Sequence, residues 1–306
     1  MEPASPDRMS SFFFAFFGIF VLLALFDAGW GRSLAHASLR RALFLTVLWL
    51  IFSLSYGGYL WKARGLSTAL DFGTIYGLEY LLSIDNLFAF YGTFRLFGIR
   101  GVTQSQLLTL GVVFAILLRV FFIWVGLSLL EKFEAGFPLF GIILFVAAVR
   151  LSRKRESEPL VPVGRKLASL APENAAETSR WLIRRSGRTL PSPRLLALLS
   201  IELADLFFAL DSIPAAFAIT LDPTVVFPAG LCAVMGLRSL YPIVQRAADR
   251  LHWLNQAIPW LLALMGAELC LKPWIAVPTA YTIALIVFLF LGTFLVSSRR
   301  RDADNR

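Results

Sequence analysis

The chain has 306 residues, 58% of them hydrophobic, and a mean hydropathy of +0.71, which together exclude a water-soluble globular domain. A formal net charge of +9 would favour a nucleic-acid partner in a soluble protein. Here the basic residues lie between long apolar runs, so no nucleic-acid partner is expected. The two cysteines lie in separate apolar runs without CxxC spacing, which excludes a disulfide framework and a thiolate metal site.

Nine apolar stretches predict an all-α fold, a polytopic membrane helical bundle of about nine transmembrane helices. The stretches cover residues 11–29, 41–60, 69–94, 106–130, 137–151, 194–219, 224–245, 254–272 and 277–297. The fifth is short for a straight crossing. Residues 1–28 lack the basic n-region and the Ala-x-Ala site of a signal peptide, so we expect the first stretch to be a retained span.

The Lys and Arg residues between the spans predict the orientation. One set of alternate loops and the C-terminal tail carry most of them. The positive-inside rule then places the N-terminus outside and the C-terminus inside the lipid bilayer, for which we expect a bacterial inner (plasma) membrane. Residues 152–193, a long basic segment, are expected to be a mostly disordered cytoplasmic linker. Within it, Trp181–Arg185 is expected to be either a solvated connector or an interfacial turn.

Two carboxylates occur near the middle of the third span. Glu79 and Asp85 lie six residues apart, and Asn86 directly follows the second. Ionisable groups at this depth are costly and usually face a bundle interior or a water-filled path, where they mark function. The alternative is that they only hold helices together as polar contacts.

The sixth span repeats this pattern. Asp205 and Asp211 are again six residues apart, and Ser212 follows the second carboxylate. Glu202, on nearly the same helical face as Asp205, is a candidate additional ligand or proton acceptor. The two stretches are therefore predicted to face each other and to form one cation site.

A regular helix would not direct all of these side chains at one ion. Glu79 and Asn86 would share a face, whereas Asp85 would point about 120° away from Glu79. An interruption is therefore expected in each span. Pro214 supplies one in the sixth span, because it cannot donate a hydrogen bond to the carbonyl oxygen of Leu210. The third span has no such proline, so a break near Asn86 is inferred from the repeat alone.

A second repeat links the fourth and seventh spans. Arg119 follows Gly111 by eight residues, and Arg238 follows Gly230 by the same interval. Because each half has three spans, the second half must be inverted, which is a transporter architecture with a site near the membrane midplane. The two arginines are expected either to balance the acids of an empty site or to be ion-pair partners that only hold helices together.

The repeats divide the chain into five segments. In order, they are an N-terminal two-helix segment (1–66), the first inverted repeat (67–151), the basic cytoplasmic linker (152–193), the second inverted repeat (194–273) and a C-terminal helix with a basic tail (274–306).

Carboxylate, amide, hydroxyl and carbonyl oxygens are hard ligands that suit Mn²⁺, Mg²⁺ or Ca²⁺. The leading hypothesis is a secondary transporter for such a divalent metal cation, with protons as the candidate counter-ion and Glu202 as the candidate proton acceptor. No bound cofactor and no nucleotide-binding loop are expected. An intramembrane aspartyl protease is disfavoured, because Phe-Ala-Leu-Asp211 replaces the Gly-x-Gly-Asp motif of such enzymes, so no enzymatic activity is expected. A non-transporting assembly factor and an exporter of a small organic cation remain as alternatives.

At these residues the sequence resembles the TerC family of integral membrane proteins, within the broader LysE-type exporter group. The resemblance covers about residues 40–297, and its motifs are Glu79-x5-Asp85-Asn86-Leu-Phe, Glu202-x2-Asp205-x5-Asp211-Ser-Ile-Pro214 and Gly236-Leu-Arg238-Ser-Leu-Tyr241. It implies metal-ion homeostasis, chiefly Mn²⁺ efflux, with an association with tellurium resistance. It also implies, for some relatives, metal supply to exported enzymes and, for a plastid branch, thylakoid assembly.

Two further acidic residues, Glu268 and Asp27, are interpreted separately from these motifs. The end of the eighth span carries Lys in a Gly-x-Lys context in the family, but here it reads Gly266-Ala-Glu268, whereas its repeat partner Arg150 is basic. Glu268 is expected either to add an acidic gate or to reach the outer interface. Asp27, at the end of the first span, is expected to be an interfacial residue rather than a ligand.

Overall fold

The computed structural model describes residues 6–30, 39–133, 136–153, 167, 181–185, 188–247, 254–275 and 277–304. In these ranges the chain forms long helices and one two-stranded hairpin. The helices are α1 (Pro6–Trp30), α2 (Leu39–Arg64), α3 (Leu66–Leu96), α4 (Gly101–Lys132), α5 (Gly136–Arg153), α7 (Pro193–Ile219), α8 (Pro223–Ala247), α9 (Leu254–Leu271) and α10 (Thr279–Asp304), and the strands are β1 (Leu182–Arg185) and β2 (Arg188–Pro191).

Each predicted span matches one of these helices, so the expected all-α membrane fold is confirmed in outline. By length and composition, four helices in the described ranges, α1, α2, α4 and α8, could each cross a membrane. The apolar stretches in α5, α9 and α10 are shorter. The number of crossings and the inverted repeats therefore remain predictions.

Local signals explain where the helices begin and end. At the start of α7, the Ser192 hydroxyl accepts a hydrogen bond from the Leu195 amide at 3.2 Å, and Pro193 occupies the first turn, where a missing N–H does no harm. Between α3 and α4, Gly98 and Gly101 have φ angles of 67° and 63°, which residues with a Cβ rarely adopt. These glycines allow the chain to reverse within a few residues.

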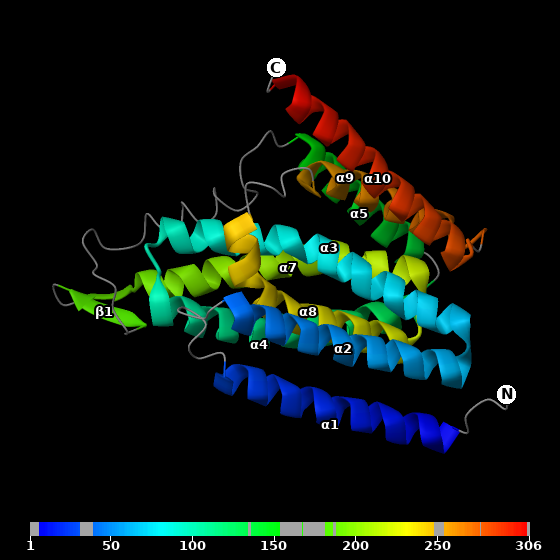
Figure 1. The fold of residues 1–306 in the computed structure, drawn as a ribbon, viewed down its shortest axis with the longest axis horizontal. Helices are drawn as coiled ribbons and strands as arrows, with labels where there is room; N and C mark the ends of the chain where they lie inside the picture. Colours follow the sequence, from blue (N-terminus) through cyan, green and yellow to red (C-terminus); the bar gives the residue numbers. More distant parts are fainter. Residues whose placement is uncertain are drawn as a thin grey trace.

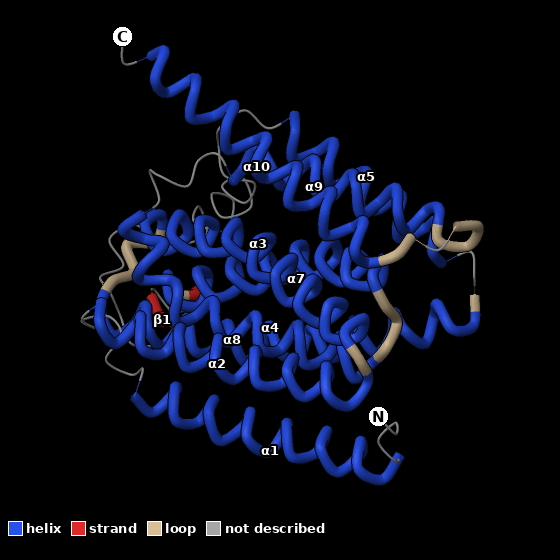
Figure 2. Tube along the Cα trace, turned by 45° about the vertical axis from the view of Figure 1, so that its right-hand side comes forward, coloured by secondary structure: helices blue, strands red, loops and turns tan. Residues whose placement is uncertain are grey.

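The helices that carry the acidic and arginine motifs lie at the centre of the bundle. α3 and α4 each pack against both α7 and α8, and α2 packs against α3 and α8. α1 lies along the outside of α2 (Figure 1). α5 and α9 pack closely together and, with α10, form a second group across α3 and α7 (Figures 1 and 2).

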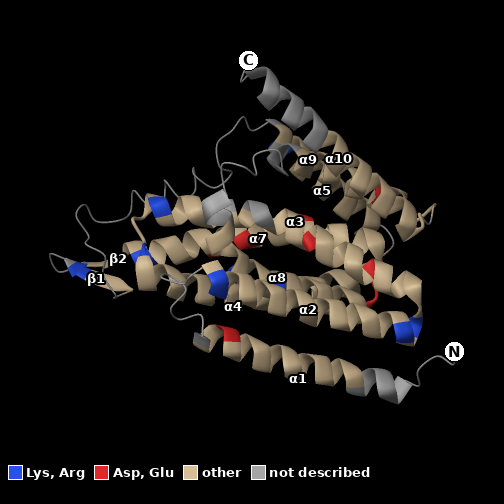
Figure 3. Ribbon diagram, viewed as in Figure 1, with Lys and Arg blue, Asp and Glu red and all other residues tan. Residues whose placement is uncertain are grey.

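The outer surface of the helices is strongly apolar. Phe14, Trp124 and Phe288 are 74%, 64% and 76% exposed. Apolar exposure of this extent would promote aggregation in water, but it fits helices that face lipid tails. Lys and Arg gather toward the helix ends, whereas acidic residues also lie part-way along α3 and α7 (Figure 3).

One of the two expected helix interruptions, the break in α3, is not found. α3 is continuous from Leu66 to Leu96, so the expected break near Asn86 is wrong. A helix without proline keeps its backbone hydrogen bonds, which lipid surroundings cannot replace. α7 continues through Pro214, which therefore does not end the helix but still deprives the Leu210 carbonyl of its usual amide donor.

The end of the basic linker forms a β-hairpin, and whether it is a solvated connector or rests on the membrane stays a prediction. Leu182–Arg185 pairs antiparallel with Arg188–Pro191, and the Ser-Gly dipeptide between them in the sequence is a typical turn signal. The Arg194 guanidinium lies 4.2 Å from the centre of the Trp181 ring, which fastens the hairpin to the start of α7. Most of the predicted disordered linker lies outside the described residues.

Candidate cation site

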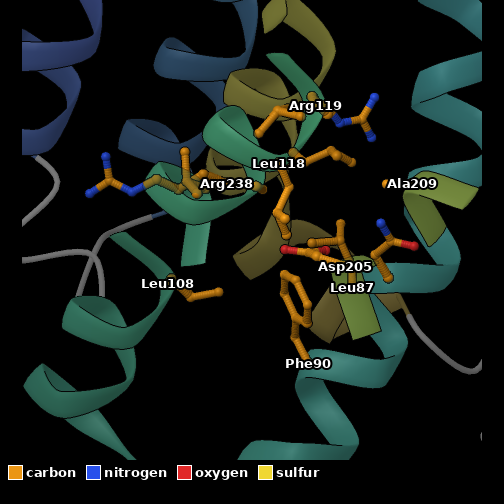
Figure 4. Close-up of a pocket in the computed structure, with 13 residues that line it drawn as sticks. Leu87, Phe90, Leu108, Leu118, Arg119, Asp205, Ala209 and Arg238 are labelled. Carbon is orange, nitrogen blue, oxygen red and sulfur yellow. The ribbon is translucent and has the colours of Figure 1, made fainter. Parts of the chain in front are cut away.

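A cavity of about 30 Å³ lies between α3, α4, α7 and α8 (Figure 4). Its polar lining consists of Asn86, Arg119, Asp205 and Arg238, and the other lining residues are apolar. A cavity of this volume can hold one or two water molecules or a dehydrated metal ion. The predicted acidic and basic motifs therefore meet at one small, mostly apolar cavity.

Three polar side chains share one face of α3. Glu79, Ser83 and Asn86 are spaced by four and three residues on a continuous helix and are all buried. Within the described residues, the Ser83 hydroxyl and the Asn86 carbonyl oxygen have no hydrogen-bond partner. Buried oxygens without a partner are costly and uncommon, so each calls for an explanation such as an absent ion or water.

α7 has a matching face. Asp205, Ala209 and Ser212 repeat the α3 spacing, with Glu202 one turn earlier. In the described part of the chain, neither Glu202 carboxylate oxygen nor the Ser212 hydroxyl has a hydrogen-bond partner. Glu202 faces α4 at Gly111, where an added Cβ would lie 3.7 Å from Glu202 Oε1. Both central helices thus carry buried oxygen atoms without a partner, and Asn86 and Ser212 occupy corresponding positions.

Arg119 supplies positive charge to the α3 side of the cavity. It forms an ion pair with Glu79, and the two side chains are only 6% and 3% exposed. The same guanidinium attracts the Asp205 carboxylate. Glu79 is therefore engaged by Arg119 and contributes to the site chiefly as that arginine's partner.

Arg238 has a partner that the sequence motifs did not predict. Its Nη1 donates a hydrogen bond to Asp27 Oδ1 at 3.1 Å, and Trp49 Nε1 donates to Asp27 Oδ2 at 3.0 Å. The Asp27 side chain is 0% exposed, so it is buried in the bundle as the partner of Arg238, and its expected position at the membrane interface stays a prediction. Arg238 thus pairs with α1 rather than with the acids of α7. The only sequence signal for this contact was Asp27 itself, the one charged residue in the apolar stretch 11–29.

The second carboxylate of each motif lies off the shared faces. On continuous helices, Asp85 and Asp211 are rotated by about 100° from Asn86 and Ser212. The Asp85 side chain lies outside the described part of the structure, and Asp211 is half-buried on α7. Among the side chains that are described, no group of three or more Asp, Glu, His or Cys could hold a metal ion. Any cation here would therefore use amide and hydroxyl oxygens as well as carboxylates.

Glu268 lies apart from this cavity. It accepts a hydrogen bond from the Thr282 hydroxyl of α10 at 2.9 Å, and it is not one of the cavity-lining residues. Its role as an acidic gate remains a prediction.

Lipid-facing apolar helices around a buried polar centre define an integral membrane protein of the polytopic helical class. The chain belongs to the TerC family: residues 65–305 match the family described as integral membrane protein TerC family. The matched region includes α3 to α10 and both acidic motifs, whereas α1 and α2 precede it.

Related proteins come from bacteria and from a plant. The chain is 32% identical over 287 residues to an uncharacterised membrane protein of Myxococcus xanthus, covering 92% of this chain and 89% of the relative. Alx of Salmonella typhi, whose name proposes a membrane-bound redox modulator, is 30% identical over 281 residues, 88% of this chain and 87% of Alx. The thylakoid membrane protein TERC of Arabidopsis thaliana is 30% identical over 249 residues, 79% of this chain and 64% of the plant protein. No solved structure gives a significant match.

Proposed function

We propose that the chain is a non-enzymatic secondary transporter that exports a divalent metal cation, Mn²⁺, in exchange for protons. In this proposal it acts in a bacterial inner membrane, with the N-terminus outside and the C-terminus inside. Membership of the TerC family supports a general role in the membrane. The oxygen ligands of the site support a hard divalent cation, whereas Mn²⁺ as the ion, protons as the counter-ion and export as the direction are parts of the proposal.

One observation carries the proposal. Buried oxygen atoms on α3 and α7 have no hydrogen-bond donor within the described residues, and they belong to Ser83, Asn86, Glu202 and Ser212. Carboxylate, amide and hydroxyl oxygens are ligands that Mn²⁺, Mg²⁺ and Ca²⁺ prefer. A cation passing between the two helices would supply the positive partner that these atoms lack.

The size of the cavity separates this proposal from one of its alternatives. A cavity of about 30 Å³ suits a dehydrated ion. Sites for organic molecules usually measure about 300–1,000 Å³, so export of an organic cation is disfavoured. A redox role, which the name of Alx proposes for that protein, has weaker support, because Cys232 and Cys270 are free cysteines on different helices.

Export can be tested in bacterial cells that lack their own manganese exporter. We would load the cells with Mn²⁺ and measure retained metal by mass spectrometry, with equal amounts of each variant in the membrane. Glu202→Gln and Asp205→Asn remove one negative charge each from the site and should abolish export. Glu268→Gln is the matched control, because this acid lies within a membrane helix but accepts a hydrogen bond from Thr282 and lies on α9, away from the polar faces of α3 and α7.

The outcomes separate the remaining functions. We expect the wild type and Glu268→Gln to lower cellular Mn²⁺ and both site variants to behave like empty cells. If the wild type retains as much Mn²⁺ as empty cells, manganese export is wrong, and Ca²⁺ and Mg²⁺ are tested next. Unaltered export in both site variants would show that the ion takes another path. A phenotype that survives in every variant without metal movement would favour the assembly-factor hypothesis.

A further inference from the structure

The two repeated arginines have different kinds of partner. Arg119 pairs with Glu79 on α3, within the region that matches the TerC family. Arg238 pairs with Asp27 on α1, which precedes that region. Figure 4 shows the two guanidinium groups pointing in different directions from the cavity, with the Arg238 group directed away from Asp205. The charge of Arg238 is thus compensated by a helix outside the repeated core.

α1 has a structure that suits this single contact. Asp27 is the one charged residue in residues 11–29, and it is completely buried. α1 otherwise contacts α2 through aromatic rings, such as Phe16 on Tyr56 and Phe20 on Trp49. Trp49 also fixes the Asp27 carboxylate by its indole N–H. An unpaired carboxylate in this apolar stretch would be costly, so Asp27 is stable there only as the partner of Arg238.

Only one of the three guanidinium nitrogens of Arg238 has a hydrogen-bond partner within the described residues. Nη1 is bonded to Asp27, whereas Nε and Nη2 are buried and have no hydrogen-bond partner within the described residues. Arg238 also lines the cavity that Asp205 lines. Without the charge of Asp27, the buried guanidinium would need another anion, and Asp205 is the carboxylate that shares its cavity.

We propose that α1 supplies a counter-charge to the site, in which Asp27 is a positioning residue that holds Arg238 toward α1 and leaves Asp205 available to a cation. Loss of the Asp27 charge lets Arg238 pair with Asp205, which fills the cavity with a fixed positive group and repels the incoming ion. The effect on ion affinity rests on the proposed function, whereas the exchange of partners by Arg238 does not.

A double-mutant cycle tests the exchange of partners without any transport assay. Thermal unfolding of the purified protein in detergent is measured for the wild type, Asp27→Asn, Asp205→Asn and the double variant. Asn keeps the shape of each side chain and removes its charge. If Arg238 turns to Asp205 when Asp27 is neutral, the double variant loses about 2–4 °C more than the sum of the single losses. The matched cycle of Asp27→Asn with Glu268→Gln should be additive, because Glu268 does not line the cavity.

Transport kinetics in proteoliposomes test the consequence for the ion. Asp27→Asn should raise the KM for Mn²⁺ by about fivefold or more with little change in maximal rate. Asp27→Glu should keep the wild-type KM, and the double variant Asp27→Asn/Arg238→Gln should recover it, because the Arg238 guanidinium is no longer there to occupy Asp205. A rise in KM at an unchanged maximal rate separates this effect from a purely structural one, which would lower the amount of active protein and with it the maximal rate.

The two experiments fail separately. If the losses in unfolding midpoint caused by Asp27→Asn and Asp205→Asn are additive, the proposal is wrong. It is also wrong if the KM of Asp27→Asn/Arg238→Gln stays as high as that of Asp27→Asn. Wild-type vesicles that move no Mn²⁺ would overturn the proposed function, and the unfolding cycle would still decide whether α1 holds Arg238. Non-additivity together with recovery by Arg238→Gln supports both.

Discussion

Glu79 and Arg119 form an ion pair in the centre of the bundle, whereas Arg64 and Asp222 form one at its end. The central pair is 3–6% exposed and the other pair 20–32% exposed. Glu79→Gln leaves a buried guanidinium without its partner, so we expect a loss of about 3–5 kcal/mol in the free energy of unfolding. Arg64→Gln, the control, should lose about 0–1 kcal/mol because water screens that pair. Denaturant titration in detergent measures both, and equal losses would contradict the assigned burial.

The sequence predicted that charged residues would be buried here, but not which residues would pair. A carboxylate or guanidinium in a long apolar run needs a partner, which local composition is enough to indicate. The partner itself depends on packing: Asp27 and Arg238 are 211 positions apart and belong to helices with no shared repeat. The unpartnered oxygens of Ser83 and Ser212 could not be predicted either. Serine hydroxyls in helices usually donate a hydrogen bond to a backbone carbonyl of their own helix, so nothing in the sequence indicated otherwise.

At the scale of helices, α5 and α9 meet where two glycines face each other. A Cβ on Gly141 would lie 2.8 Å from the carbonyl oxygen of Gly266, a backbone atom that cannot move aside without shifting α9. Close approach through small residues is the common way in which membrane helices pack. We therefore expect Gly141→Ala to lower the midpoint of thermal unfolding.

Gly73→Ala on α3 is the control for this substitution. A Cβ at Gly73 would meet nothing within 4 Å, so the change should be neutral or stabilising by up to about 1 kcal/mol, the helix-propensity gain of Ala over Gly. The two variants should thus shift the unfolding midpoint in different directions. If Gly141→Ala is as well tolerated as Gly73→Ala, the close packing of α5 and α9 is wrong.

Hydropathy predicted where each helix begins and ends, but not that α3 is continuous. The expectation of a break near Asn86 assumed that both carboxylates of each motif had to reach one ion. The continuous α3 and α7 instead present Glu79, Ser83 and Asn86, or Asp205 and Ser212, on one face without a break. Glu79 and Asn86 were already expected to share one face of a regular helix, and the continuous α3 keeps that arrangement.

For the whole molecule, contacts between helix ends give the arrangement that the orientation prediction requires. The end of α2 meets the start of α8 through Arg64 and Asp222, and Lys272, after α9, donates to the Ala218 carbonyl oxygen at the end of α7 at 2.8 Å. At the opposite end, Arg194 donates to Gln106 at 2.8 Å, which joins the starts of α7 and α4. Helix ends that the sequence predicts to lie on the same side of the membrane thus lie together.

The side of the membrane that each end faces can be tested by labelling. In a background with Cys232→Ala and Cys270→Ala, single cysteines are introduced as Ser67→Cys at the start of α3 and Ser152→Cys at the end of α5, both exposed positions. The excess of Lys and Arg at the second end predicts that it is cytoplasmic. A membrane-impermeant maleimide should therefore label Ser67→Cys in intact spheroplasts, and Ser152→Cys only after the membrane is permeabilised. The reverse pattern would show that the predicted orientation of the whole bundle is wrong.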